Sequence, residues 1–439
     1  MMSASSKITD EQRRALVGGR HRLAPSARTD DVAQIADSLV ALHSTDPVTV
    51  YLSVLARMRN PDLGAVAQAL YESRSLIRHH AMRTTLWVAT PDNVAVMHQA
   101  CTVKIAATQR RRTEKFLAQS GVTDPGPWLQ DAKDQVCRVL AEHGPLTTRE
   151  IGAVLPDIAL PLQMAVGTSY AATQGAHSRV VTGLGFDGMA VRTEPGARWI
   201  NAQYAWALMQ DWAPDLHTQL SCDPDRLTAS CTVCARAHCL HDQDEAATRH
   251  AQAELATLWL ARFGPGTERD LSWWAGWTLG DTRAALAACG AVPMDTPSGQ
   301  AWALPSAADV LDGGVDRERD AGVGSPSDDE PWVALLPGLD PSVMGWKERG
   351  FYLAPGGEAA WDSNGNAGPT VWMDGQVVGA WGQTKGGEIR LRLFVDVPAD
   401  RRRQIEARAA QVRDWLGETR ISWRFPGAVN AELIAPALR

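Results

Sequence analysis

The stretch GPLTTREI at residues 144–151 recurs as GPGTERDL at residues 264–271. In each copy an apolar-periodic helix runs into Gly-Pro, and a threonine then stands three residues before an acid, at the spacing of a capping box. This pattern predicts a helix end followed closely by a new helix start, which is how a helix-turn-helix reads in sequence. Because an internal repeat indicates a repeated architecture, we predict winged-helix modules in tandem, with nucleic acid as the first partner to test.

Periodicity and turn signals along the chain predict an α+β fold that is mostly helical. Three strand patterns, at residues 332–336, 370–373 and 377–381, predict a small C-terminal β-sheet or barrel-like element, with a hairpin at Asp374-Gly375. The predicted segments are a first winged-helix module with a candidate catalytic motif (9–120), a second module (125–215), a third module (245–305), a solvated linker (313–331), the β element (332–395), and a C-terminal helix and tail (398–439).

Some local predictions bear on the sites. An apolar stripe over residues 32–42 predicts a helix that stops near residue 43, and residues 162–173 read as another helix. Residues 180–199 read as a hairpin, within which residues 183–188 match the dinucleotide pattern GxGxxG. The strand and turn that follow contradict a dinucleotide site, which needs a helix there. We therefore interpret these glycines as a wing turn.

Composition limits the possible functions. The 439 residues, 45% of them apolar, suffice for two to four small domains. A net charge of −7 disfavours a protein coated in phosphate-binding surface, so any DNA contact needs a local basic face. The sequence has no apolar run of the roughly 20 residues that span a bilayer, and its start lacks the apolar core of a signal peptide. We expect a cytoplasmic monomer, nucleoid-associated when bound to DNA, with no membrane partner.

A cluster of cysteines and histidines suggests a metal site. Cys231, Cys234, Cys239 and His241 resemble half of a structural zinc site. Against that, a mostly continuous helix over residues 231–260 would not place them all on one face. We predict no metal and no cofactor for the chemistry, and a structural zinc stays open as the alternative. Seven cysteines, an odd number, also argue against a disulfide framework.

The order of several motifs resembles the bacterial tandem winged-helix DNA glycosylases, the family that includes the azinomycin-resistance and interstrand-crosslink glycosylases. The motifs are LHSTDP at 42–47, MRTTL at 82–86, the two Gly-Pro repeats, LPGLDP at 336–341 and Asp-Gly at 374–375. The resemblance implies excision of bulky N7-alkylated purines from double-stranded DNA that carries alkylated guanine or adenine. It also implies a role in DNA repair or in self-resistance to a genotoxin.

The resemblance places the catalytic motif at residues 43–45. The family's motif is a pair of polar residues around one variable residue, usually Gln-x-Gln or Gln-x-Asp; here His43 and Thr45 stand in the two polar positions. An N7-alkylated guanine is cationic and leaves readily, so the remaining work is to place water at C1′ and stabilise an oxocarbenium-like sugar. Neutral His43 can accept the water's proton, the Thr45 hydroxyl can orient the water, and ionised Asp46 can stabilise positive charge.

Each of these residues also has a structural interpretation. His43 can be a helix C-terminal histidine bound to the last carbonyls, and Thr45 a turn residue. Asp46 can be the N-cap of a helix that begins at Pro47, a role compatible with catalysis. No lysine adjoins the trio, so we expect a monofunctional enzyme with water as nucleophile.

The candidate DNA contacts lie elsewhere in the chain. Arg83, Arg111 and Arg112 belong to basic clusters, although a charge run also suits a solvated helix face. Gln376 adjoins the predicted hairpin tip, which in the family approaches a DNA groove, although ordinary turn chemistry predicts the same residues.

Two other classes of function remain open at this level. A non-enzymatic winged-helix transcription regulator needs only the modules, whereas the polar trio and the acidic balance favour an enzyme. A scaffold that uses the 222–241 cluster for zinc and protein contacts would bind metal and lack DNA affinity. The sequence has no GxSxG, Walker or HExxH motif.

Overall fold

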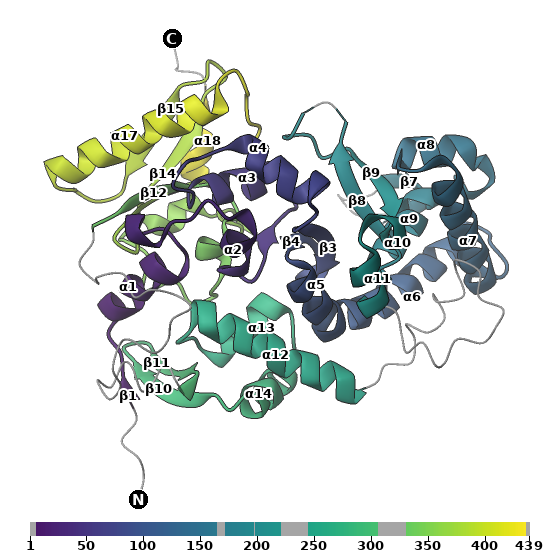
Figure 1. The fold of residues 1–439 in the computed structure, drawn as a ribbon, viewed down its shortest axis with the longest axis horizontal. Helices are drawn as coiled ribbons and strands as arrows, with labels where there is room; N and C mark the ends of the chain where they lie inside the picture. Colours follow the sequence, from purple (N-terminus) through teal and green to yellow (C-terminus); the bar gives the residue numbers. More distant parts are fainter. Residues whose placement is uncertain (1–5, 165–171, 197, 221–244, 306–330, 436–439) are drawn as a thin grey trace, which may run out of the picture. The chain divides into compact units, whose positions relative to one another are not determined.

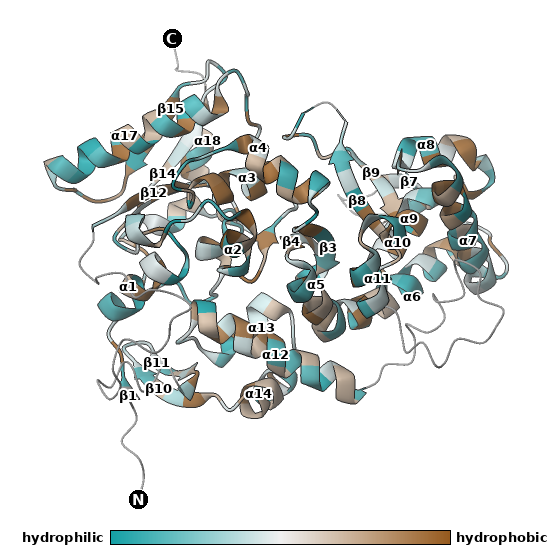
Figure 2. Ribbon diagram, viewed as in Figure 1, coloured by the Kyte–Doolittle hydropathy of each residue, from teal (hydrophilic) through white to brown (hydrophobic). Residues whose placement is uncertain are grey.

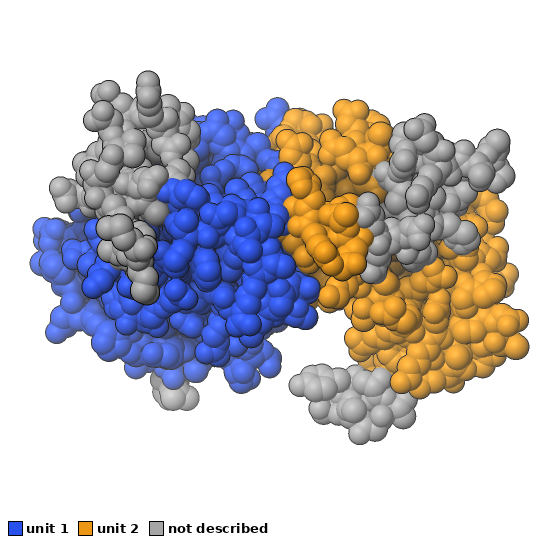
Figure 3. All heavy atoms as spheres, turned by 90° about the horizontal axis from the view of Figure 1, so that it is seen from below, with its two compact units in different colours: residues 1–69, 88–90, 253–439 blue, residues 70–87, 91–252 orange. Residues whose placement is uncertain are grey.

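The protein is an α+β fold with several small sheets (Figure 1). The computed structural model describes residues 6–164, 172–196, 198–220, 245–305 and 331–435. The chain divides into two compact units, coloured separately in Figure 3. Unit 1 contains residues 1–69, 88–90 and 253–439, and unit 2 contains residues 70–87 and 91–252. The boundaries of the winged-helix modules stay predictions.

Unit 1 begins with short elements that start at side-chain caps. They are α1 (Asp10–Arg20), α2 (Val32–Asp37), β2 (Leu42–His43), α3 (Pro47–Leu55) and α4 (Leu63–Ala67), which a π-helical turn (Gln68–Glu72) continues. At the start of α1 the Thr9 hydroxyl accepts the Gln12 N–H at 3.1 Å, and the Gln12 side chain accepts the Thr9 N–H at 2.8 Å. This reciprocal pair is a capping box, as the spacing predicts.

The helix expected to run to residue 42 is wrong in its length, because α2 ends at Asp37. The Ser38 hydroxyl donates to the Ile35 carbonyl at 2.7 Å, and Val40 adopts a positive φ of 61°. A β-branched residue at positive φ cannot continue a right-handed helix. The apolar stripe therefore continues on extended chain, and His43 lies at the end of a strand.

The second repeat copy lies where α12 ends. The helices there are α12 (Glu245–Phe263), α13 (Glu268–Ala275) and α14 (Leu279–Ala288). Thr267 accepts the Asp270 N–H at 3.1 Å, and Asp270 accepts the Thr267 N–H at 3.0 Å, which confirms the predicted capping box. A three-stranded sheet follows, in which β10 (Val292–Thr296) lies between β1 (Ser6–Lys7) and β11 (Gly299–Ala303).

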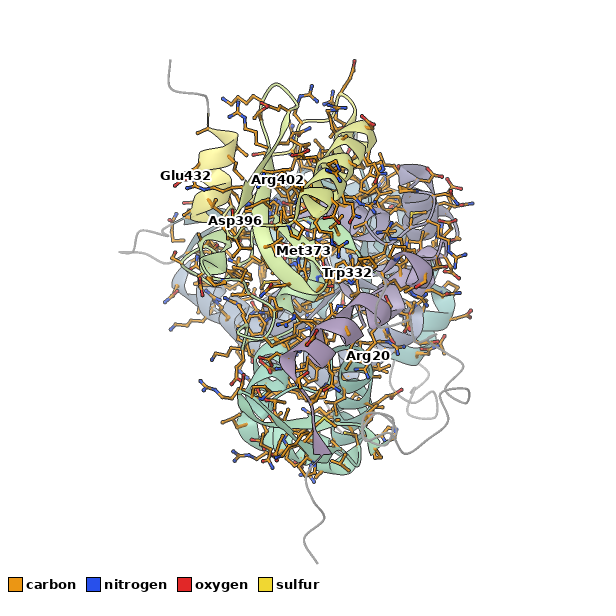
Figure 4. The ribbon with its side chains drawn as sticks, turned by 90° about the vertical axis from the view of Figure 1, so that its left-hand side faces the viewer. Arg20, Trp332, Met373, Asp396, Arg402 and Glu432 are labelled. Carbon is orange, nitrogen blue, oxygen red and sulfur yellow. The ribbon has the colours of Figure 1, made fainter. Side chains whose placement is uncertain are left out.

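The C-terminal β element is a four-stranded antiparallel sheet. Its strands, in spatial order, are β12 (Val333–Leu336), β13 (Thr370–Met373), β14 (Gln376–Gln383) and β15 (Ile389–Leu393). The predicted hairpin at Asp374-Gly375 is confirmed, and Figure 4 shows Trp332 and Met373 together at that end of the sheet. The expected barrel-like closure is wrong for the described residues, because β12 and β15 are two separate edges.

Two helices accompany this sheet. They are α17 (Ala399–Leu416), which lies within the predicted C-terminal segment, and α18 (Ala428–Ile434). Most of the α17 ribbon carries the hydrophilic colour in Figure 2. Its buried side includes Ile405, Val412 and Leu416, at the spacing of one helix face. The helix therefore covers the sheet with a narrow apolar stripe.

Unit 2 is built mainly from helices, and four of them share one core. Its helices are α5 (Pro91–Met97), α6 (Val103–Gln119), α7 (Pro125–His143), α8 (Thr148–Val154), α9 (Ala176–Phe186), α10 (Met209–Trp212) and α11 (Pro214–Leu220). Leu117, Val136, Ile151 and Leu184, from four of these helices, meet in this core. At the first repeat copy, Thr147 and Glu150 form the predicted capping box at the start of α8.

The strands of unit 2 form small sheets. They are β3 (Ile77–Ala81) beside β4 (Thr85–Ala89), β6 (Pro161–Met164) paired with β7 (Ala172–Gly175), and β5 (Leu146–Thr147), β9 (Tyr204–Leu208) and β8 (Ala190–Pro195) in that order. The helix expected over residues 162–173 is therefore wrong at residues 162–164 and 172–173, which lie in the antiparallel strands β6 and β7, and residues 165–171 lie outside the described residues. Alternation of side chains in β6, where Leu162 alone is buried, fits a strand better than a helix face.

The hairpin expected over residues 180–199 is also wrong. Residues 183–186 lie in α9, and the actual hairpin joins β8 to β9. A Cβ on Gly185 would lie 2.9 Å from the Trp206 ring and 3.0 Å from the His80 ring. This glycine lets two aromatic side chains pack against the helix backbone, so it serves packing and not a wing turn.

Candidate active site

The polar trio of the sequence prediction lies in unit 1 between β2 and α3. His43 ends β2, so its interpretation as a helix C-terminal residue is wrong. The Asp46 carboxylate accepts the Val48 N–H at 3.1 Å, and Pro47 is the first residue of α3. The N-cap interpretation of Asp46 is therefore confirmed, and it brings His43, Thr45 and Asp46 together at the start of one helix.

His43 is held by its neighbour two residues on. Its side chain is 5% exposed, and its Nδ1 accepts the Thr45 backbone N–H at 3.4 Å, a long hydrogen bond. An Nδ1 that accepts places the proton of the neutral imidazole on Nε2. In that tautomer the only ring N–H of His43 is on Nε2.

The surroundings of Asp46 shift the pKa of its carboxyl group. Burial raises its pKa, while the N–H groups of Val48 and Arg424 and the charge of Arg424 act in the opposite direction. A buried carboxylate whose pKa is raised accepts protons more readily at neutral pH than an exposed one. Capping and proton acceptance are therefore compatible at this residue.

The helix that follows the trio, α3, is anchored to the segment at residues 336–342. The Thr49 hydroxyl donates to the Gly338 carbonyl at 2.6 Å, and the Ser53 hydroxyl donates to Asp340 at 2.6 Å. Asp340 also caps α16 (Pro341–Met344) by accepting the Ser342 N–H at 2.9 Å. The Asp-Pro motif at 340–341 thus mirrors the one at 46–47, and it fixes the inner face of α3.

A fully buried ion pair completes this anchor. Arg57 donates from its two terminal nitrogens to the two oxygens of Asp340, at 2.9 and 2.8 Å, and both side chains are 0% exposed. Burial raises the pKa of Asp340, but the Arg57 charge and the hydrogen bonds outweigh it, so the pKa is lowered. Asp340 stands within a motif noted in the sequence, but its pairing with Arg57 was missed, because 283 positions separate the two residues.

Asp46→Asn is expected to separate the structural role of Asp46 from a chemical one. Asparagine caps helices as well as aspartate, so the cap persists. Because burial raises the pKa of Asp46, the wild-type penalty for burying its charge applies above that pKa and fades as the pH falls toward about 3.9. The variant should therefore be at least as stable as wild type at pH 7, with the difference shrinking in acid.

Activity gives the second readout for this variant. If the Asp46 carboxylate acts on the reacting groups, base release should slow by about 10²-fold or more without loss of stability. Thermal unfolding from pH 4 to 8 and single-turnover rates measure the two effects. Full activity in Asp46→Asn would leave Asp46 as a cap alone.

Comparison with known proteins identifies the class of enzyme. The family model described as "DNA glycosylase AlkZ-like" matches residues 36–415. The chain belongs to the AlkZ-like DNA glycosylase family. The site at the start of α3 and its anchor at residues 336–342 both fall within the matched range.

A solved structure shares the fold of this AlkZ-like glycosylase. The DNA glycosylase AlkZ of Streptomyces sahachiroi matches with a TM-score of 0.63 and 19% sequence identity, over 95% of this chain and 99% of that chain. No curated protein matches the sequence. Membership of the family makes the protein an enzyme that acts on DNA, so the regulator and scaffold alternatives are set aside.

The candidate DNA contacts of the glycosylase differ in exposure. Arg111 and Arg112 are exposed on α6, where Arg111 contacts the Thr108 hydroxyl at 3.4 Å. Arg83 is half-buried, and burial lowers its pKa to about 10. Beside Gln376, the turn at Gly375 packs closely on Arg14 of α1. Exposure therefore supports Arg111 and Arg112 as DNA contacts more than Arg83 and Gln376. All four DNA contacts stay predictions.

The other sequence predictions meet limits in what the structure describes. The cluster Cys231, Cys234, Cys239 and His241 lies outside the described residues, as does the predicted linker apart from Pro331. Among the residues that are described, no group of three His, Cys, Asp or Glu side chains is arranged to hold a metal. Of the described helices, none combines the length and apolar character needed to cross a bilayer.

Proposed function

We propose that this AlkZ-like glycosylase excises bulky N7-alkylated purines from double-stranded DNA, with water attacking C1′ of the damaged nucleotide. One observation carries the proposal: His43, Thr45 and Asp46 are gathered at the start of α3, inside the range that the family model matches. The groups are polar, and His43 and Asp46 are nearly buried. Such a site suits a reaction that needs a positioned water more than a strong acid.

The leaving group explains why modest side chains suffice. An N7-alkylated purine carries a positive charge on its imidazole ring, so breaking the bond to C1′ releases a neutral base. No residue has to protonate the base. The enzyme has only to stabilise the oxocarbenium-like sugar and to deliver water to its open face.

The geometry supports roles for His43 and Asp46 that differ from the roles predicted from the sequence. Because Nδ1 of His43 accepts the Thr45 N–H, its Nε2–H orients the water and Asp46, whose pKa burial raises, takes the water's proton. The Asp46 charge also stabilises the sugar cation before that transfer. Thr45 positions the His43 ring through its backbone and the water through its hydroxyl.

The reaction ends at an abasic site. A glycosylase that also cleaves the strand needs an amine nucleophile, usually a lysine, to form a Schiff base. The sequence has no lysine between Lys7 and Lys104, so none is near the trio along the chain. We therefore propose a monofunctional enzyme that acts as a monomer on alkylated guanine or adenine, in DNA repair or self-resistance.

A cleavage assay tests this proposal. Duplexes with one bulky N7-alkylguanine or one N7-methylguanine are incubated with enzyme, and hot alkali converts abasic sites to strand breaks. We expect breaks at the bulky adduct at a higher rate than at the methyl adduct, and none before alkali. Heat-inactivated enzyme is the control, because N7-alkylguanines are also lost spontaneously. Intact adducts at stoichiometric enzyme, or a preference for the methyl adduct, would overturn the proposal.

A further inference from the structure

A basic cavity lies within unit 2, apart from the residues of the trio. Its volume is about 290 Å³, and its lining comes from α6, α7, α9 and β8 among other segments. Among the described residues that line it, four are basic (Arg110, Lys133, Arg179 and Arg192) and one is acidic (Asp187). His80 also lines the cavity, and because burial lowers its pKa to about 3, it is neutral at pH 7.

The one acidic residue of the cavity wall, Asp187, already has an ion-pair partner within the protein. The Lys133 ammonium donates to Asp187 at 2.5 Å, and both side chains are 6% exposed. Arg110 pairs with Glu114 on the next turn of α6, at 2.9 Å. Each of these two pairs sets a basic residue of the cavity wall, Lys133 or Arg110, against a carboxylate.

Arg179 is held in a way that leaves its charge without an anionic partner among the described residues. Its Nε and Nη2 lie 3.3 Å from the Met164 sulfur, a weak and uncharged acceptor. Its guanidinium also lies 4.8 Å from the centre of the Phe116 ring. Burial lowers its pKa, and so does the neighbouring charge of Arg112. A partly desolvated cation beside another cation is costly unless an anion binds.

We propose that this cavity is a phosphate-binding subsite in which Arg179 is the principal ligand. A guanidinium binds a phosphate through two parallel N–H donors, which a thioether cannot exploit. Gln109 lines the same cavity, and its side-chain amide supplies a further N–H donor. The volume of the cavity is close to the lower end of the range for ligand pockets, about 300–1,000 Å³, which leaves room for one phosphate ester.

Two sources can supply this phosphate, a backbone phosphodiester of DNA or the phosphomonoester of a free nucleotide. The established activity supplies the first, and we expect it to be the occupant. The inference does not depend on which adduct the enzyme excises, because its test uses undamaged DNA. A failure of the cleavage assay and a failure of this test are therefore distinguishable.

The test compares Arg179→Gln with Arg138→Gln in the full chain. Arg138 is exposed on α7 and does not line the cavity, so both variants lose one positive charge in unit 2 but only one loses the site. Binding to an undamaged duplex is measured across a salt series. Losing one phosphate contact should reduce the slope of log K against log salt by about 0.9. We expect that reduction in Arg179→Gln and a smaller one in Arg138→Gln.

A second arm identifies the source of the phosphate. Thermal unfolding is recorded with inorganic phosphate and with adenosine monophosphate for wild type and both variants. An unchanged slope for Arg179→Gln, together with loss of the stabilisation by adenosine monophosphate, would assign the site to a free phosphomonoester. Equal behaviour of the two variants in both arms would overturn the subsite. Should Arg179→Gln fold poorly, the isosteric Gln109→Glu, which adds a negative charge to the wall, is expected to reduce the slope in the same way.

Discussion

Replacing His43 with alanine is expected to slow release of an N7-alkylated purine by about 10²–10³-fold, the range for loss of one positioned hydrogen-bond donor. His43 lies nearly buried at the end of β2, with its ring oriented by the Thr45 N–H. Alanine removes the donor that holds the attacking water, while Asp46 and the start of α3 are retained. Single-turnover rates on a bulky N7-alkylguanine duplex measure the effect.

His43→Gln is the matched control for this prediction. A glutamine side chain can donate a hydrogen bond from its amide, and glutamine is the residue usual at this position in the resembling family. If His43 orients water, His43→Gln should keep most of the wild-type rate and a similar pH profile. If His43 instead takes the water's proton, His43→Gln should be as slow as His43→Ala. A wild-type rate in both variants would remove His43 from the mechanism.

Stability has to be followed alongside these rates. His43 is 5% exposed, so alanine leaves a small void beside α3 that costs some stability. A slow but fully folded His43→Ala protein, with a normal near-UV spectrum at the assay temperature, assigns the loss to chemistry. A rate that recovers when the temperature is lowered below the variant's melting point would assign it to folding.

Asp340→Ala is expected to lower the free energy of unfolding by about 3–5 kcal/mol, the range for breaking a buried ion pair from one side. The change leaves the fully buried Arg57 guanidinium without its carboxylate and the Ser53 hydroxyl without its acceptor. It also removes the cap of α16. Urea unfolding monitored by tryptophan fluorescence measures the loss.

Two comparisons make this stability prediction specific. Glu432→Ala removes one partner of the exposed pair Arg392–Glu432, whose side chains are 59% and 65% exposed, and should cost no more than about 1 kcal/mol. The double variant Arg57→Met with Asp340→Leu replaces both buried charges with apolar groups. It should be more stable than Asp340→Ala, because no unpaired charge remains. A loss equal to that of Glu432→Ala would contradict a buried pair.

The same pair predicts a pH dependence of stability. Because the pKa of Asp340 is lowered on folding, the unfolded chain binds its proton at a higher pH than the folded protein. The stabilisation is therefore complete above about pH 4, the unfolded value, and is lost as the pH falls through the lower folded pKa. Asp340→Ala should be less sensitive than wild type to acid in that range.

The anchor and the site are linked through α3. Thr49 and Ser53, on successive turns of this helix, bind Gly338 and Asp340, and the trio stands at the start of the same helix. Loss of Asp340 is therefore expected to slow base release as well as to destabilise the protein. The two effects differ from those of His43→Ala, which should slow the reaction without a comparable loss of stability.

Local signals in the sequence predicted the features that depend on neighbours a few residues apart. The capping boxes at Thr9, Thr147 and Thr267, the cap at Asp46 and the hairpin at Asp374 are all confirmed. Each involves a side chain and a backbone group within three or four residues, so its energy is present in any chain with that sequence. The order of the motifs also identified the family, which the family model then showed.

Where tertiary contacts compete with local patterns, the sequence predictions fail. Residues 183–186 read as a glycine-rich turn but are helical, because Gly185 gives Trp206 and His80 room to pack on α9. Residues 162–164 read as a helix but form a strand, because β7 provides a partner for their backbone groups. Helix and strand propensities differ by less than the energy of such packing and pairing.

By itself, then, the sequence determined where helices begin, where the C-terminal hairpin turns, which family the motifs follow and which short segment carries the candidate chemistry. Only the tertiary structure decided that His43 arrives on a strand, that Arg57 meets Asp340 beneath α3, and that basic residues from four elements line one cavity. The first group rests on interactions between residues close in the chain. The second rests on burial and charge pairing between residues far apart in the chain, which come together only when the core forms.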